Sequence, residues 1–163
     1  MKRIISFLLC ALLALSLCAC GESVNMGVLT EYQNADFEAE IQIKNGSKEL
    51  LCSLSKNDGR LFLRIRGLEE FTFALDENGA SIISGGTEIP LGICEPLPIC
   101  EVYHLFSAPV AGTWKIEKSR PGGVPVYVCE GDGITLYIDA YSHIPLKIIY
   151  GAMEADVLSF RVK

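Results

Sequence analysis

Residues 37–66, FEAEIQIKNGSKELLCSLSKNDGRLFLRIR, determine the fold class of this chain, because apolar and polar residues alternate in them with a period of two. Apolar side chains occupy every second position of 37–43, up to Asn45 and Gly46, whose tolerance of positive φ suits a tight hairpin turn. The alternation resumes at 50–54 and again after the turn signal at 57–59. Three consecutive antiparallel strands are therefore expected.

The same pattern extends through most of the chain. Turn signals recur at intervals of about 8 to 12 residues, which is typical of an all-β sandwich, meander or barrel. We expect about ten strands, at 37–44, 50–56, 61–66, 71–75, 82–84, 113–118, 124–129, 134–139, 146–150 and 156–163. Each strand must bury one apolar face, and a single sheet can do so by curling around an inserted helix, a ligand or both.

Two segments depart from the strand pattern. Residues 89–109 contain four prolines and two cysteines, and the run 99–107 within them has apolar residues at helical spacing, so a loop and one short helix are expected. Residues 24–35 predict a short amphipathic helix that packs on one side of the sheet. Its apolar side chains would be Met26, Val28, Leu29 and Tyr32.

The N-terminus has the three-part order of a secretory signal: two cations, an uncharged apolar run at 4–19, and a small residue before Cys20. Leu17, Ala19 and Cys20 fit the lipobox of bacterial lipoproteins, in which the cysteine receives a diacylglyceryl group. Cys18 fits less well, because bulky Leu17 precedes it. Two alternatives are an ordinary cleaved signal and an uncleaved membrane helix, although the apolar run is shorter than the roughly 20 residues that a span usually needs.

This interpretation divides the chain into a signal peptide at 1–19, a lipidated cysteine with tether and short helix at 20–36, and one β-rich domain at 37–163. Removal of Lys2 and Arg3 with the leader lowers the basic count from 14 to 12 against 20 acidic residues, a balance of −8. Such a charge disfavours nucleic acid as a partner and electrostatic attachment to anionic lipids. The lipid would then hold the chain at the extracytoplasmic face of the cell membrane, with the β domain close to the surface.

The stretch FEAEIQIKNG at 37–46 follows a short helical lead, and ITLYIDAYSHIPLKIIYG at 134–151 precedes the final DVLSFRVK at 156–163. With these stretches the chain resembles the LolA-like group of extracytoplasmic lipoprotein-sorting and lipid-binding proteins. The resemblance implies a strongly curved antiparallel sheet, an unclosed half-barrel with one or two short helices on its concave side, which binds acyl chains or lipidated proteins in an apolar hollow. It carries over no catalytic residue, and it leaves the ligand-binding residues unknown. It does not imply a soluble shuttle, since this chain is expected to be anchored.

Four cysteines follow Cys20, and an even number in an exported chain favours disulfides. Cys94 with Cys100 would close a short loop, and Cys52 with Cys129 would join the two halves of the chain. Buried free thiols are the alternative, because three of the four have apolar neighbours. A zinc site at Cys94, Cys100 and His104 would have non-standard spacing and no clear fourth ligand, so no metal site is predicted.

The remaining polar sets favour structural roles. Asp139, Ser142 and His143 would crowd into one hairpin tip, without the scaffold that a catalytic triad needs. Arg64 and Arg66 beside two glutamates at 69–70 indicate a solvated face with cross-strand pairs. The glycine pairs at 85–86 and 122–123 indicate turns, with no helix behind them to form a phosphate site.

The sequence therefore favours a membrane-anchored, non-enzymatic lipoprotein without a cofactor. It would bind a hydrophobic ligand, such as a lipid, an acyl chain or a lipoprotein segment, in the hollow of its sheet. The alternative is a cell-envelope sensor or protein-interaction module with no bound lipid. A carrier needs a continuous apolar cavity, whereas an interaction module can fill that hollow with its own side chains. An anchored hydrolase ranks third and would need titratable groups that converge in the cavity.

The anchor is tested by Cys20→Ala. Loss of the modified thiol should release the chain from membranes or block its processing, because durable attachment by this route needs the acyl chains on that sulfur. Membrane fractionation and intact-mass measurement of the mature species check this. An unchanged membrane-bound mature form would refute the anchor.

Overall fold

The described residues, 24–91, 102–103, 106–107 and 112–163 of a computed structural model, form one antiparallel sheet of eleven strands. The strands are β1 (Phe37–Asn45), β2 (Lys48–Asn57), β3 (Arg60–Ile65), β4 (Thr72–Asp76), β5 (Gly79–Ser84), β6 (Thr87–Leu91), β7 (Lys115–Ser119), β8 (Val126–Gly131), β9 (Ile134–Asp139), β10 (Pro145–Tyr150) and β11 (Met153–Val162). β6 and β7 form the two edges and do not pair with each other, so the sheet stays unclosed. The expected mainly β half-barrel is confirmed.

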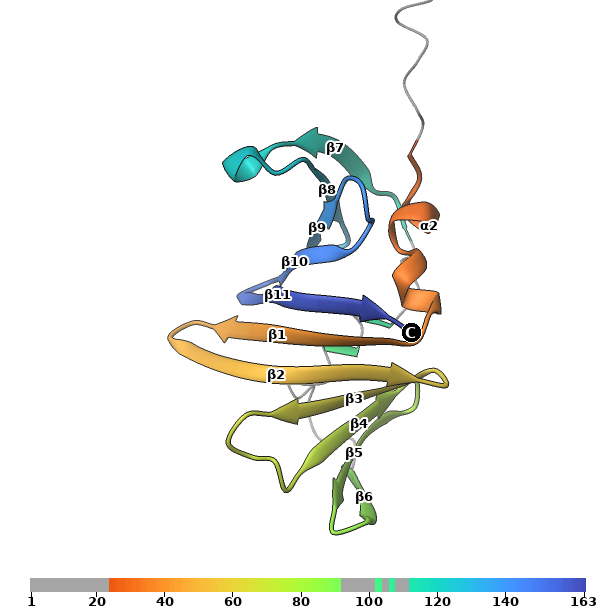
Figure 1. Cartoon of the computed structure of the whole chain (residues 1–163), viewed down its shortest axis with the longest axis vertical. Coiled ribbons are helices and arrows are strands. Elements are labelled where there is room, and N and C mark those ends of the chain that lie inside the picture. The colour runs from red at the N-terminus through yellow and green to blue at the C-terminus, as the bar shows by residue number, and fades with distance from the viewer. Residues whose placement is uncertain (1–23, 92–101, 104–105, 108–111) are drawn as a thin grey trace, which may run out of the picture.

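The first and last strands lie side by side in the middle of the sheet (Figure 1). The strand order is β6-β5-β4-β3-β2-β1-β11-β10-β9-β8-β7, so two meanders meet at the β1–β11 pair. Phe37 pairs with Val162 at one end of this ladder and Asn45 pairs with Met153 at the other. The two halves of the chain are thus one structural unit, because β1 of the first half and β11 of the second share a ladder.

The first hairpin forms where the sequence predicts it, with a small difference in its turn. Gly46 has φ +60°, whereas Asn45 is the last residue of β1 and pairs with Lys48. The two turn residues are therefore Gly46 and Ser47, with glycine where the backbone needs positive φ. The turn between β2 and β3 uses Asp58 and Gly59, both with positive φ.

The structure has one strand more than the ten expected from the sequence. This additional strand is β6, and it lies where the sequence predicts the start of a loop. Pro90 misled that prediction, because proline cannot donate a hydrogen bond to a neighbouring strand. In the structure Pro90 is opposite Ser81 on an edge strand. An edge strand tolerates proline, since only one of its sides has to pair.

One face of the sheet, called the core face below, carries the buried side chains. The helical segment consists of α2 (Met26–Leu29) and the 3₁₀ helix η1 (Glu31–Asn34), and its Leu29 and Tyr32 are buried in the core. Val28 was expected on the same apolar side but is 44% exposed. The helix is a single turn, so it buries fewer positions than the predicted one.

The connection from β6 to β7 must pass between the two edges of the sheet. Two of its described residues, Val102 and Phe106, are buried, and the ring of Phe106 lies 6.4 Å from that of Phe37. Phe37 also stacks on Phe160 of β11 with 4.7 Å between ring centroids. Most of the predicted helix at 99–107 lies outside the described residues.

A buried lysine attaches the helical segment to the sheet. Lys56 of β2 is buried, and its Nζ donates a hydrogen bond to the backbone carbonyl oxygen of Gln33 in η1. Burial lowers the pKa of Lys56, and the nearby Asp36 carboxylate partly opposes that effect. The segment that follows the expected tether is therefore fixed to one end of β2 (Figure 1).

Phe37→Ala should lower the free energy of unfolding by about 3–5 kcal/mol, because it removes a fully buried ring from contact with two others. Leu158→Ala is the control: this β11 side chain is 58% exposed, so its loss should cost below about 1 kcal/mol. Equilibrium denaturation by urea measures both changes. Equal losses in the two variants would contradict the placement of the core.

Candidate functional site

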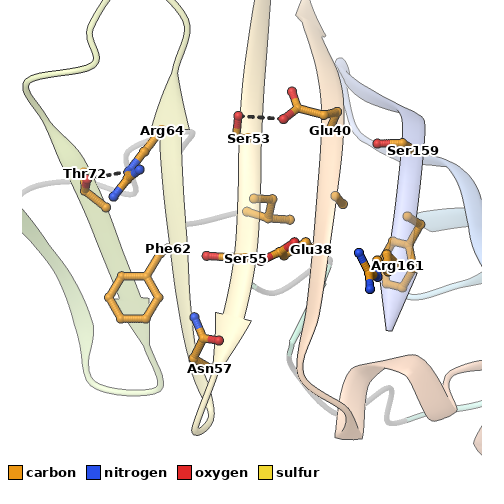
Figure 2. Close-up of a pocket in the computed structure, with 13 residues that line it drawn as sticks. Glu38, Glu40, Ser53, Ser55, Asn57, Phe62, Arg64, Thr72, Ser159 and Arg161 are labelled. Carbon is orange, nitrogen blue, oxygen red and sulfur yellow. Dashed lines mark hydrogen bonds between the residues drawn. The ribbon is translucent and has the colours of Figure 1, made fainter. Parts of the chain in front are cut away.

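The face of the central strands opposite the core face, called the polar face below, carries an open hollow of about 720 Å³ (Figure 2). We call it the polar hollow. Its side chains come from β4, β3, β2, β1 and β11, five neighbouring strands of the sheet. The residues that line it are Glu38, Ala39, Glu40, Ser53, Leu54, Ser55, Asn57, Phe62, Arg64, Thr72, Ser159, Phe160 and Arg161.

Strand register arranges these side chains in two rows across the sheet. The first row runs from Arg64 through Ser53 and Glu40 to Ser159. The second row runs from Phe62 through Ser55 and Glu38 to Arg161. Rows two residues apart along a strand are separated by about 6.7 Å. The two arginines therefore stand at diagonally opposite corners of the polar hollow.

A β-bulge in β11 determines which of its side chains enter the polar hollow. Glu40 pairs with Ser159 but Ile41 pairs with Val157, so Leu158 is the extra residue. The insertion reverses the alternation: Ala155 and Val157 face the core before it, and Phe160 faces the core after it. Ser159 and Arg161 consequently lie on the polar face. A bulge also bends its strand and increases the local twist.

The charged groups of the polar hollow differ in how well they are paired. Glu38 forms an ion pair with Lys163, whose Nζ lies 3.1 Å from the carboxylate. Glu40 accepts a hydrogen bond from Ser53 Oγ at 2.8 Å. Arg64 donates from Nε to Thr72 Oγ1 at 3.1 Å and contacts no carboxylate among the described residues (Figure 2). Within that same part of the chain, the guanidinium group of Arg161 has neither a hydrogen bond nor an ion pair.

Elsewhere on the polar face the charges are paired within the sheet. Lys44 Nζ lies 2.7 Å from Asp156, and Lys147 Nζ lies 2.5 Å from Glu154. The hydrogen bond to Asp156 raises the pKa of Lys44, and the one to Glu154 raises the pKa of Lys147. The arginines of the polar hollow thus contrast with a paired neighbourhood on the same sheet.

Phe62 supplies the aromatic surface of the polar hollow and is held by Arg60. The Arg60 guanidinium carbon lies 5.6 Å from the centroid of the Phe62 ring. Arg60 Nη2 also donates to Glu88 at 2.5 Å, and this bond raises the pKa of Arg60 and, with a hydrogen bond from Ser81, lowers that of Glu88. The ring is therefore positioned by a network that reaches β6.

A second, apolar cavity of about 370 Å³ lies on the core face. We call it the apolar cavity. It is lined by Ile43, Asn45, Lys48, Leu50, Cys52, Leu63, Ile65, Phe73, Val102 and Met153. Its volume falls at the lower end of the range of about 300–1,000 Å³ for small-molecule sites. Among the described residues of its lining, only Asn45 and Lys48 offer side-chain amide or charged groups to a ligand.

Of the cysteines and the histidine that the sequence singles out as possible lipidation, disulfide or zinc positions, the structure describes Cys52 and Cys129. Cys20, Cys94, Cys100 and His104 lie outside the described residues. Cys52 and Cys129 are free and buried, so the predicted disulfide between them is absent. They lie on β2 and β8, with four strands between them in the sheet, and thiols so placed cannot bond without backbone movement. Burial raises the pKa of each thiol to about 11, which makes them poor nucleophiles near neutral pH.

The hairpin tip at Asp139 has the structural role that the sequence indicates. Asp139 Oδ1 accepts hydrogen bonds from the backbone N–H groups of Tyr141 and Ser142 and from Ser142 Oγ. The bond from the Ser142 backbone makes the largest contribution to lowering the pKa of Asp139. The glycine pairs at 85–86 and 122–123 have positive φ. The first pair lies in the turn between β5 and β6, as predicted, and the second lies in the one-turn 3₁₀ helix η2 (Pro121–Gly123).

The arginine and glutamate pairs expected around 64–70 are not formed. Arg64 bonds to Thr72, and the Glu69 carboxylate accepts the backbone N–H of Gly67. That backbone bond is the main cause of the lowered pKa of Glu69. The short turn after β3 directs the Glu69 carboxylate to the backbone of Gly67, and Arg66 makes only a smaller electrostatic contribution to the lowered pKa.

The described residues contain neither a metal-binding cluster nor a membrane-spanning helix. No three His, Cys, Asp or Glu side chains there lie close enough together to hold a metal ion. Nor does that part of the chain contain a helix with the length and apolar character that a membrane span requires.

No protein-family model matches the chain, and no curated protein matches it. Among solved structures it is similar to the crystal structure of MucB, with TM-score 0.47, 14% identity and coverage of 83% of this chain. The Pseudomonas aeruginosa MucA/MucB complex gives TM-score 0.42, 14% identity and 84% coverage, and MucB in complex with MucA(peri) gives 0.42, 15% and 85%. The chain spans 54–56% of the length of these structures. At this level the similarity supports no statement about function.

Proposed function

We propose that the chain is a non-enzymatic, extracytoplasmic protein-interaction module of the cell envelope, and that it binds another protein through the polar hollow. The observation that carries this proposal is the open hollow of about 720 Å³ in which Arg64 and Arg161 have no carboxylate partner among the described residues. Exposed, unpaired guanidinium groups at the rim of a hollow suit recognition of a second molecule.

The filling of the core face favours this function over that of a carrier. Leu29, Phe37, Phe106 and Val102 are all almost completely buried, so the chain occupies much of that face with its own side chains. A carrier of lipidated proteins needs a continuous apolar cavity there. The extracytoplasmic, lipid-anchored location remains part of the proposal, as does membership of the LolA-like group that the sequence resembles.

The apolar cavity supports a second candidate function, the binding of a small hydrophobic ligand. Its walls are almost entirely apolar, and Lys48 at its lining has no hydrogen bond or ion pair among the described residues. This combination suits a ligand with one short apolar part and an anionic group. The resemblance to lipid-binding proteins implies acyl chains or lipidated proteins as ligands, which share the apolar part of such a molecule.

Photo-cross-linking tests the interaction function. A benzophenone amino acid in place of Phe62 should yield one discrete adduct with an extracytoplasmic protein in host cells, because this ring faces the polar hollow. The matched control carries the same group at Tyr141, an aromatic residue 81% exposed in the β9–β10 turn. Mass spectrometry identifies the adducts. Absence of an adduct at Phe62, or the same adducts at both positions, would refute binding through the polar hollow.

Dye binding tests the second candidate function. Anilinonaphthalene sulfonate, which is apolar and anionic, should fluoresce when bound to the full chain. Leu50→Trp should lower that signal several-fold, because Leu50 lines the apolar cavity and is 44% exposed, so the larger ring can fill the cavity. Leu158→Trp, outside this cavity, is the control. Equal fluorescence from the two variants would rule out ligand binding in the apolar cavity.

A further inference from the structure

We infer that the partner segment bound in the polar hollow is an extended peptide with two acidic side chains, one for Arg64 and one for Arg161. This inference rests on the proposed interaction function and specifies the chemistry of its partner. The net charge of the whole chain is −6, so a general attraction for acidic molecules is not expected. Selectivity for acids must therefore come from the local arrangement of these two guanidinium groups.

The separation of the arginines favours two carboxylates over one phosphate. Arg64 is on β3 and Arg161 is on β11, with β2 and β1 between them. Three strand spacings of about 4.8 Å across the sheet and one row spacing of about 6.7 Å along it place the two backbones about 16 Å apart on the diagonal. A single phosphate needs donors that converge on one point, whereas here the donors stand at opposite corners. An extended peptide rises about 3.4 Å per residue, so acids about four or five residues apart span about the same distance.

The surface between the arginines suits a peptide backbone. Ser53, Ser55 and Ser159 present hydroxyl groups along the two rows, and these can donate to or accept from peptide groups. Phe62 offers an apolar ring beside them. These polar groups are spread over the floor, as contacts to a chain would be, and do not gather in one place as contacts to a lipid headgroup would.

Glu40 limits where the acidic residues of the peptide can lie. It occupies the first row between Ser53 and Ser159 and has a hydrogen bond from Ser53 but no cationic partner among the described residues. Its charge would repel an acidic side chain directly above it. The residues between the two acids of the peptide should therefore be neutral or basic.

Selection from a displayed library of random 12-residue peptides on the full-length chain tests this inference. We expect Asp or Glu to be enriched at two positions about four or five residues apart, with neutral or basic residues between them. The variant with both Arg64→Gln and Arg161→Gln should lose this enrichment, whereas Arg120→Gln, an exposed arginine outside the polar hollow, should retain it. Glu40→Gln should admit acids at the central positions. Circular dichroism verifies that each variant is folded.

Affinities of one selected peptide complete the test. Replacement of its two acids by their amides should weaken binding at least about tenfold, and each single Arg→Gln variant of the chain should weaken it several-fold. Selected peptides without acidic enrichment would overturn the inference but leave the interaction function intact. Failure to select any peptide, together with no cross-link at Phe62, would overturn both. Arginine-dependent binding of phosphatidylglycerol vesicles or inorganic phosphate in place of peptides would overturn it in favour of an anionic headgroup or ion.

Discussion

The pairing of β1 with β11 is the constraint on which the rest of this structure depends. It joins the first and last strands of the sheet, so the two remaining free edges, β6 and β7, lie at opposite ends of an eleven-strand order. The chain from β6 to β7 must then cross between these edges. Val102 and Phe106 of that connection are buried with Phe37 of β1, so the connection fills part of the core that the open sheet would expose.

The same strand pair shapes the polar face. The extra residue Leu158 is 58% exposed and shifts the alternation of β11 by one position. Phe160 thereby joins the core beside Phe37, while Arg161 lies on the polar face opposite Glu38. One inserted residue thus supplies both an aromatic contact of the core and a charged corner of the polar hollow. Bulges often redirect side chains in this way near functional sites.

Local sequence patterns were sufficient to predict most of the strands, but not how distant strands combine. The alternation in 37–66 and the turn residues Asp58 and Gly59 lie close together in sequence, so they specify hairpins directly. Strict alternation in β11 would place Arg161 on the same face as Val157, and only the bulge corrects this. β6 was missed because a single proline resembles a strand end but is tolerated at a sheet edge.

The polar hollow was harder to predict, because its two rows combine residues from distant strands. Arg64 and Arg161 are far apart in sequence, and the register that brings them to one face follows from the β1–β11 pairing. The alternating polar residues Glu38, Glu40, Ser53 and Ser55 carried part of the signal, since each pair faces one side of its strand. Alternation within each strand does not show which strands lie side by side, so it could not place these residues around one hollow.

The position of the helical segment relates the polar hollow to the expected anchor. Four Cα steps separate Cys20 from Val24, so an extended chain there spans at most about 14 Å. From that point the chain enters α2 and η1, which Lys56 holds against β2.

Asp36 follows this helical segment and bonds to residues at the ends of β2 and β11. Its backbone carbonyl accepts a hydrogen bond from the backbone N–H of Lys163, and its carboxylate accepts one from the backbone N–H of Asp58. Asn57 and Arg161 of the polar hollow are close to these residues along their strands. The helical segment that follows Cys20 in the sequence therefore ends beside the polar hollow, where β2 and β11 end.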